Sequence, residues 1–316
     1  MKETSLNLRL NDFIVYKRSL GYDYKTAERY LNKYRSYMSE NYPDVLVPDK
    51  DSTDSFLNLY QGQSGGLHNA MAALREFSRY LYNLGLKEAY IIPAKQMPKL
   101  NPDPPYFLSE EEISLFFNEC DSYYNASGKY PSKLVIPAFF RFLYCCGVRP
   151  KEGRTLLSKN VNLEENYIDI LQSKGPVSRR LFISNELADY LTQYDRHIRA
   201  MFPNRKYFFP SDIDRHYSVS AIVYHFQIVW KTAFPEWIGK YPRLYDFRHH
   251  FAWATINSWV REGVDVNAML PYLMRYMGHN CIKHTLYYFR FVPDFYNDYQ
   301  DLAMSLNDRI PEVSDE

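Results

Sequence analysis

The sequence is poor in cysteine, with four among 316 residues: Cys120, Cys145, Cys146 and Cys281. They form no Cys-x-x-Cys pair and no disulfide framework, which indicates a cytoplasmic protein in a reducing environment. No group of His, Cys, Asp and Glu has the spacing of a zinc site. We therefore expect no metal and no other cofactor.

Long apolar runs and a large net charge are also missing. No run reaches the roughly 18–20 residues of a membrane span, so we expect no membrane partner. The formal net charge is +1, but residues 294–316 carry 1 basic and 7 acidic side chains, which gives that segment a charge of −6. The preceding 293 residues are therefore mildly basic, at +7. Such a charge is compatible with a nucleic-acid partner without requiring one.

Aromatic residues are abundant, with 30 Tyr and 20 Phe, and apolar residues recur at helical spacing along most of the chain. We predict a helical domain over residues 1–95, a proline-rich linker over 96–107, and a second domain over 108–316 with an acidic tail from about 294. Within the second domain, residues 167–171 and 180–183 are predicted to form two short strands joined by a turn. The expected fold class is mainly α with a small antiparallel β-hairpin.

Four polar motifs interrupt the apolar background of the second domain. In chain order they are Gly147-Val148-Arg149-Pro150-Lys151-Glu152, Lys174 near the hairpin tip, Tyr245-Asp246-Phe247-Arg248-His249-His250-Phe251-Ala252, and Gly278-His279 with Tyr288 nine residues after the histidine. This order and spacing resembles the catalytic domain of the tyrosine recombinase (phage integrase) family. The family has Gly-x-Arg-x-x-Glu, a hairpin Lys, His-x-x-Arg-His-x-Phe-Ala, and Gly-His followed by Tyr. The resemblance covers about residues 108–290, and residues 1–95 resemble the family's core DNA-binding domain in position and helicity.

The resemblance implies a DNA strand transfer that needs no metal. Tyr288 would attack a backbone phosphate and form a covalent 3′-phosphotyrosine. The guanidinium groups of Arg149 and Arg248 would bind the charge of the transition state bidentately. Lys174 would protonate the departing 5′ oxygen as a general acid, and His279 would donate a hydrogen bond to the phosphate.

One position departs from the family pattern, because Tyr245 stands where the family has His. A neutral tyrosine with an ordinary pKa of about 10 is a poor base near neutral pH, although it can still hydrogen-bond a phosphate oxygen. His249 or His250 is a possible substitute for the missing base, but adjacent helical side chains point differently from the residue three positions back, so we interpret both as packing or supporting residues. Glu152 would orient neighbouring groups such as the first arginine. Tyr287 is the alternative nucleophile.

The predicted function is therefore a site-specific DNA recombinase or integrase of a mobile element. The resemblance implies double-stranded DNA as partner, a homo-tetramer on two DNA sites, and accessory recombination proteins. Two alternatives stay open: a catalytically inactive DNA-binding regulator, suggested by Tyr245, and a type IB-like topoisomerase. The acidic tail would pack either on its own domain or on a neighbouring protomer.

Overall fold

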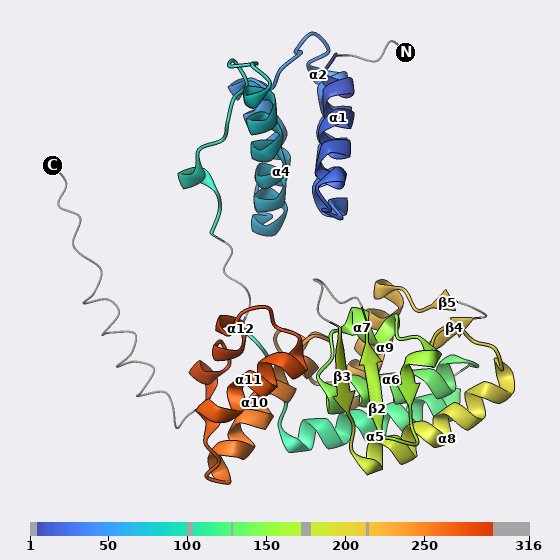
Figure 1. The fold of residues 1–316 in the computed structure, drawn as a ribbon. Coiled ribbons are helices and arrows are strands. Elements are labelled where there is room, and N and C mark those ends of the chain that lie inside the picture. The colour runs from blue at the N-terminus through green and yellow to red at the C-terminus, as the bar shows by residue number, and fades with distance from the viewer. Residues whose placement is uncertain (1–4, 100–103, 128, 172–177, 213–214, 293–316) are drawn as a thin grey trace. The chain divides into compact units, whose positions relative to one another are not determined.

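The computed structural model describes residues 5–99, 104–127, 129–171, 178–212 and 215–292 (Figure 1). The chain forms two compact units, Met1–Asp103 and Pro104–Glu316, and the boundary between them falls within the predicted linker. The hairpin tip with Lys174 and the acidic tail from residue 294 lie outside the described residues.

Unit 1 is helical. Its α-helices are α1 (Ser5–Ser19), α2 (Lys25–Asn41), α3 (Lys50–Leu57) and α4 (Ser64–Asn83). Helices α2 and α4 pack against each other, and α1 contacts both. The buried residues of α4 recur at steps of three and four, as expected for a helix with one apolar face: Ala70, Met71, Ala73, Leu74, Phe77, Ser78 and Leu81.

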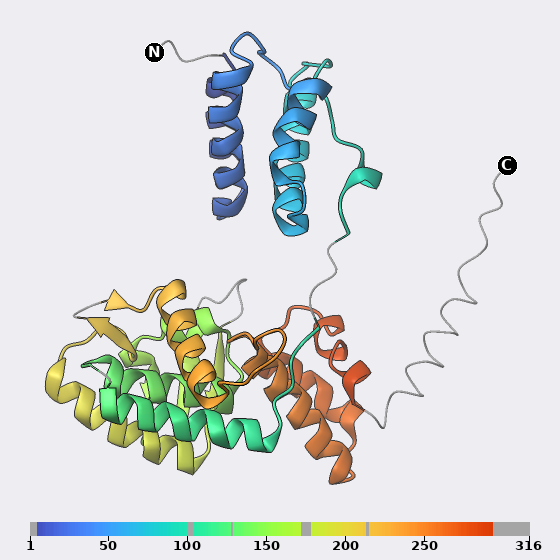
Figure 2. The same cartoon turned by 180° about the vertical axis from the view of Figure 1, so that it is seen from behind.

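Unit 2 is organised around the apolar helix α6 (Ser132–Cys146), which packs against α5 (Glu110–Ser127), α8 (Asn185–Met201) and α10 (Asp246–Arg261). Helix α9 (Val219–Ala233) packs against α5, and the two helices lie at the front of unit 2 in Figure 2, which shows the view of Figure 1 from behind. Most of the α6 surface is buried because helices cover it on several sides. Phenylalanine and tryptophan rings fill much of this core, among them Phe116, Phe140, Phe226, Trp230 and Phe247.

The predicted hairpin is present and belongs to a three-stranded antiparallel sheet. The strands are β1 (Val161–Asn162), β2 (Tyr167–Ile170) and β3 (Arg179–Phe182), in the order β1-β2-β3. Tyr167 pairs with Phe182 and Ile170 pairs with Arg179. A second antiparallel pair, β4 (Pro210–Asp212) with β5 (Arg215–His216), was not predicted. The described residues thus confirm the mainly α fold class with a small antiparallel sheet.

A smaller core forms where α10 meets the end of the described chain. It involves α11 (Val266–Met277), α12 (Lys283–Leu286) and the short 3-10 helix η4 (Phe289–Phe291). Its buried members are Ala252, Ile256, Val266, Leu270, Leu273, Met277, Tyr288 and Val292. This core positions the predicted nucleophile, because Tyr288 lies between α12 and η4 and packs within it.

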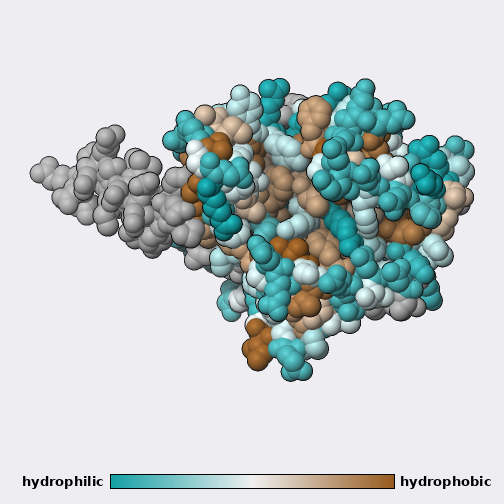
Figure 3. All heavy atoms as spheres, turned by 90° about the horizontal axis from the view of Figure 1, so that it is seen from below, coloured by the Kyte–Doolittle hydropathy of each residue, from teal (hydrophilic) through white to brown (hydrophobic). Residues whose placement is uncertain are grey.

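In the ranges given above, no helix is both long enough and apolar enough to cross a membrane. The face of the molecule seen in Figure 3 is mostly hydrophilic, and its hydrophobic patches are small and separated by polar side chains.

Candidate active site

Two glycines end helices at the centre of the site. Gly147 follows α6 and Gly278 follows α11, and both have a left-handed backbone, with φ of 56° and 64°. A Cβ atom on Gly147 would overlap the ring of Phe251 in α10, and one on Gly278 would lie 2.9 Å from Nη1 of Arg179. Glycine permits both the sharp turn and the close approach. The two glycines therefore let α10 and β3 approach the ends of these helices.

Arg248 extends from α10 toward both helix ends. Its side chain is almost fully buried, and it donates from Nη1 to the Gly147 carbonyl at 2.8 Å and from Nη2 to the Met277 carbonyl at 2.6 Å. Because carbonyl groups at a helix C-terminus carry partial negative charge, they hold the cation in place. Among the described residues, Nε of Arg248 has no hydrogen-bond partner. A buried donor without a partner is unfavourable, so this atom suits an anionic ligand.

Arg149 is the N-cap of the short helix α7 (Pro150–Arg154). Its Nη1 donates to Oε1 of Glu152 at 2.7 Å, and its Nη2 donates to the Gly278 carbonyl at 2.7 Å. The first motif is therefore bonded directly to the last. The guanidinium group is oriented from two sides before any ligand arrives.

Arg179 is a buried member of the site that sequence reasoning missed. It opens β3, donates from Nε to the Tyr276 carbonyl at 2.6 Å, and bonds Oε2 of Glu152 from Nη2 at 2.7 Å. Inward and outward positions alternate along β3, and Arg179 shares the inward side with Leu181. An arginine at an inward strand position was the signal that could have identified it. Lys174 belongs to the tip before this strand, outside the described residues.

His279 lies among these charges. Its Nδ1 is 2.9 Å from the hydroxyl of Thr285, a fully buried residue of α12. Burial, together with the positive charges of Arg248 and Arg149, lowers the pKa of His279 to about 3. The imidazole is therefore neutral near pH 7. When Thr285 donates to Nδ1, Nε2 carries the proton and can donate to a ligand.

Tyr288 is buried, and its hydroxyl lies 3.1 Å from Nδ1 of His249. Burial raises the pKa of the Tyr288 phenol above its ordinary value, and the charge of Arg248 opposes that rise. The neighbouring Tyr287 packs against Arg290, whose guanidinium carbon lies 3.8 Å from the Tyr287 ring centre. Tyr288 is therefore the tyrosine that senses the charge of Arg248, whereas Tyr287 packs on Arg290.

Tyr245 lies at the edge of the site. It is 39% exposed and contributes to the wall of a cleft of about 910 Å³ that Arg149 also lines. Its ring contacts His249 edge to face, with 5.0 Å between the ring centroids. Residues four apart lie on the same side of a helix, which accounts for the contact between Tyr245 and His249. His249 thus contacts both Tyr245 and Tyr288, and His250 stacks on the ring of Tyr144 in α6.

Comparison with known proteins identifies the family. Residues 106–292 match the sequence model of the phage integrase family. The chain belongs to the phage integrase family. This membership confirms the predicted family and the predicted enzyme class, a tyrosine-type DNA strand transferase.

Similar proteins of the phage integrase family span most of the chain. The integrase/recombinase y4rE of Sinorhizobium fredii is 26% identical over 295 residues, which cover 90% of this chain and 91% of that protein. Among solved structures, XerH site-specific recombinase bound to palindromic difH has a TM-score of 0.65 at 17% identity, covering 88% of this chain and 79% of that one. A lambda integrase dimer bound to a COC′ core site has a TM-score of 0.65 at 15% identity, with 90% and 76% covered. These structures share the fold.

Proposed function

We propose that the chain is a site-specific recombinase of a mobile element that cuts and rejoins duplex DNA through a covalent 3′-phosphotyrosine. One observation carries the proposal: the buried Tyr288 is close enough to the buried Arg248 for that cation to act on its phenol pKa, and Nε of Arg248 has no hydrogen-bond partner in the described part of the chain. Tyr288 supplies the nucleophile, and Arg248 supplies a preformed site for a phosphate. The integrase/recombinase y4rE, which is similar along most of its length, supports the same function.

The arginines would act on the phosphate in the transition state. Its non-bridging oxygens gain negative charge there, and Arg149 and Arg248 already have fixed orientations through their carbonyl and carboxylate partners. Preorganised donors of this kind typically lower a barrier by about 3–4 kcal/mol each. His279 would add a hydrogen bond from Nε2, and Lys174 would protonate the departing 5′ oxygen.

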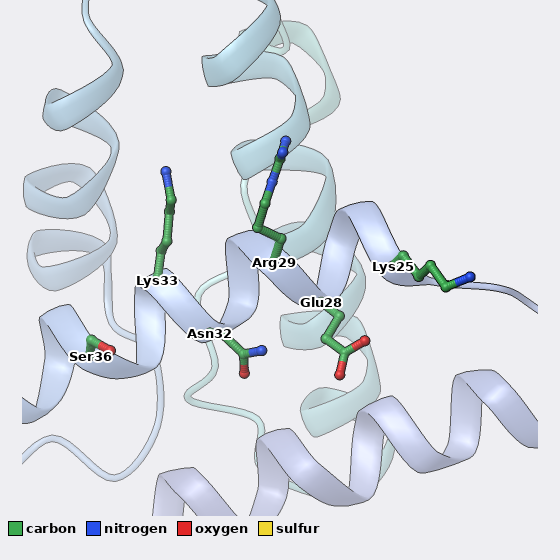
Figure 4. Close-up of a pocket in the computed structure, with 6 residues that line it drawn as sticks. All are labelled: Lys25, Glu28, Arg29, Asn32, Lys33 and Ser36. Carbon is green, nitrogen blue, oxygen red and sulfur yellow. The ribbon is translucent and has the colours of Figure 1, made fainter. Parts of the chain in front are cut away.

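Unit 1 would hold the DNA through the exposed face of α2. Lys25, Arg29 and Lys33 follow one another at four-residue steps on that face, and Asn32 and Ser36 lie beside them (Figure 4). Arg29 and Lys33 form no ion pair within the described part of the chain, and both point to the same side of α2. Cations at this spacing on a helix suit consecutive phosphates of a DNA backbone.

We also propose that four copies assemble on two duplexes. Strand exchange needs a 5′-hydroxyl from a second duplex to attack the phosphotyrosine, so each exchange reaction uses two DNA sites. A lambda integrase tetramer bound to a Holliday junction has a TM-score of 0.60 with this chain. The acidic segment 294–316 would then pair with a basic surface of a neighbouring copy.

A covalent-adduct assay tests the proposal. The DNA site is first selected from a random duplex pool with the Tyr288→Phe variant, which binds without cutting. A duplex with that site and a nick beside the scissile phosphate then traps the covalent product, because the short 5′ fragment diffuses away. We expect an adduct that survives SDS with wild type and with Tyr287→Phe, and none with Tyr288→Phe.

The outcomes separate the alternatives. DNA binding without any adduct would favour the inactive regulator, the candidate that Tyr245 supports. An adduct formed by Tyr288→Phe and lost in Tyr287→Phe would move the nucleophile by one residue. Relaxation of a plasmid without exchange between duplexes would favour the topoisomerase.

A further inference from the structure

The hydroxyl of Tyr288 has a defined hydrogen-bond partner. Nδ1 of His249 lies 3.1 Å from it, and among the described residues no other side chain bonds this hydroxyl. Tyr288 is 3% exposed, so water competes little for the contact. The phenol proton therefore points toward an imidazole nitrogen when Tyr288 donates.

His249 also stands on the correct side of α10. The family pattern has histidines at the positions of both residue 245 and residue 249, and a step of four returns to the same side of a helix. The contact between the rings of Tyr245 and His249 shows this proximity directly. Of the two histidine positions in the pattern, the chain thus keeps the second, which lies beside the nucleophile, while a tyrosine occupies the first.

The surroundings keep His249 neutral, which is the state that can accept a proton. The pKa of His249 is lowered to about 4, mainly by burial and also by the charges of Arg243 and Arg248, while the carboxylate of Asp246 acts in the opposite direction. Tyr287 and Tyr288 face the ring from the chain segment after α12. A bound phosphate diester would offset the guanidinium charge and so make His249 a stronger base when substrate is present.

We propose that His249 is the general base for Tyr288, in place of the histidine that Tyr245 replaces. The inference rests on the proposed function. The lone pair of Nδ1 takes the phenol proton, the Tyr288 oxygen forms a bond to phosphorus, and the bond from phosphorus to the 5′ oxygen breaks. The 5′ oxygen leaves with a proton from Lys174. In rejoining, a 5′-hydroxyl gives its proton back to Lys174 as it attacks phosphorus, the bond from phosphorus to the Tyr288 oxygen breaks, and His249 returns its proton to that oxygen.

A substrate that carries sulfur in place of one oxygen distinguishes the loss of the general base from the loss of the general acid. A nicked substrate with sulfur in place of the bridging 5′ oxygen needs no proton on its leaving group, so it rescues a missing acid and leaves a missing base unrescued. We expect His249→Asn to slow adduct formation about 100-fold on both substrates. Lys174→Ala should be slow only on the oxygen substrate. His250→Asn, the matched control on the same helix, should stay within a few-fold of wild type on both.

Two further variants decide between proton transfer and positioning. Asparagine can still hydrogen-bond Tyr288 but cannot take its proton, so a His249→Asn enzyme with wild-type rates would overturn the proposal. His249→Ala should regain adduct formation when imidazole is added, because the His249 side chain is itself partly exposed and leaves a space that solvent can reach. If Tyr245→Phe slows adduct formation on both the oxygen and the sulfur substrate while His249→Asn keeps the wild-type rate, the general base is Tyr245. A wild type without any adduct would overturn the proposed function as well.

Discussion

Replacing Glu152 by glutamine tests whether its buried carboxylate anchors the site. The Glu152 side chain is 5% exposed and bonds Arg149 and Arg179, whose side chains are 21% and 3% exposed. Each of its oxygens accepts from both arginines: Oε1 from Nη1 of Arg149 and Nη1 of Arg179, and Oε2 from Nη2 of Arg179 and the backbone N–H of Arg149. A glutamine has one oxygen, so its amide NH₂ must face a guanidinium donor whichever way it turns.

The expected loss follows from burial. Removing one partner of a buried ion pair costs about 3–5 kcal/mol, because the remaining charge stays desolvated. The matched control is Asp169→Asn. Asp169 accepts two hydrogen bonds from Arg180 near the surface, where the Arg180 side chain is 49% exposed and the Asp169 side chain is 29% exposed. Exposed pairs contribute about 0–1 kcal/mol. The two variants make the same chemical change in opposite environments.

Urea unfolding followed by tryptophan fluorescence measures the difference. All four tryptophans lie in unit 2, so the signal reports the unit that contains Glu152: Trp230, Trp237, Trp253 and Trp259. With an m value of about 2–3 kcal/mol/M, Glu152→Gln should lower the midpoint by about 1–2 M. Asp169→Asn should shift it by less than about 0.5 M. Equal shifts would refute the argument that burial makes the Glu152 cluster a structural anchor.

Two further changes address the helix-ending glycine and the histidines. Gly147→Ala should lose about 2–5 kcal/mol of unfolding free energy through backbone strain and overlap with α10. Gly263→Ala is the control, because Gly263 has a φ of 68° and no atom within 4 Å of an added Cβ, and it should lose only about 1–2 kcal/mol. Equal losses in urea unfolding would contradict the overlap. Because burial lowers the pKa of His249 to about 4 and of His279 to about 3, the unfolded chain binds protons first as pH falls below about 6.5. Stability should be full above that pH and decrease toward pH 4, with a smaller decrease in His249→Asn; an unchanged slope would contradict the shift.

Several elements of the site could be predicted because their signals are local. Helical periodicity placed α4 and α6, and alternation around a turn placed β2 and β3. Gly147 and Gly278 were recognisable as breaks, since a left-handed residue at a helix end favours glycine. The spacing of the motifs also indicated the family, because a family pattern records which residue types recur at which intervals.

The sequence by itself determined the mainly α fold, the motif residues and the family. Only the tertiary structure decided how those residues divide the work. Arg149 bonds a carbonyl 129 positions later, and His249 bonds a hydroxyl 39 positions later. No local pattern encodes such contacts, because they depend on where α7, α10 and α12 meet. The tertiary structure therefore identified Arg179 as an anchor and showed that His249 reaches Tyr288.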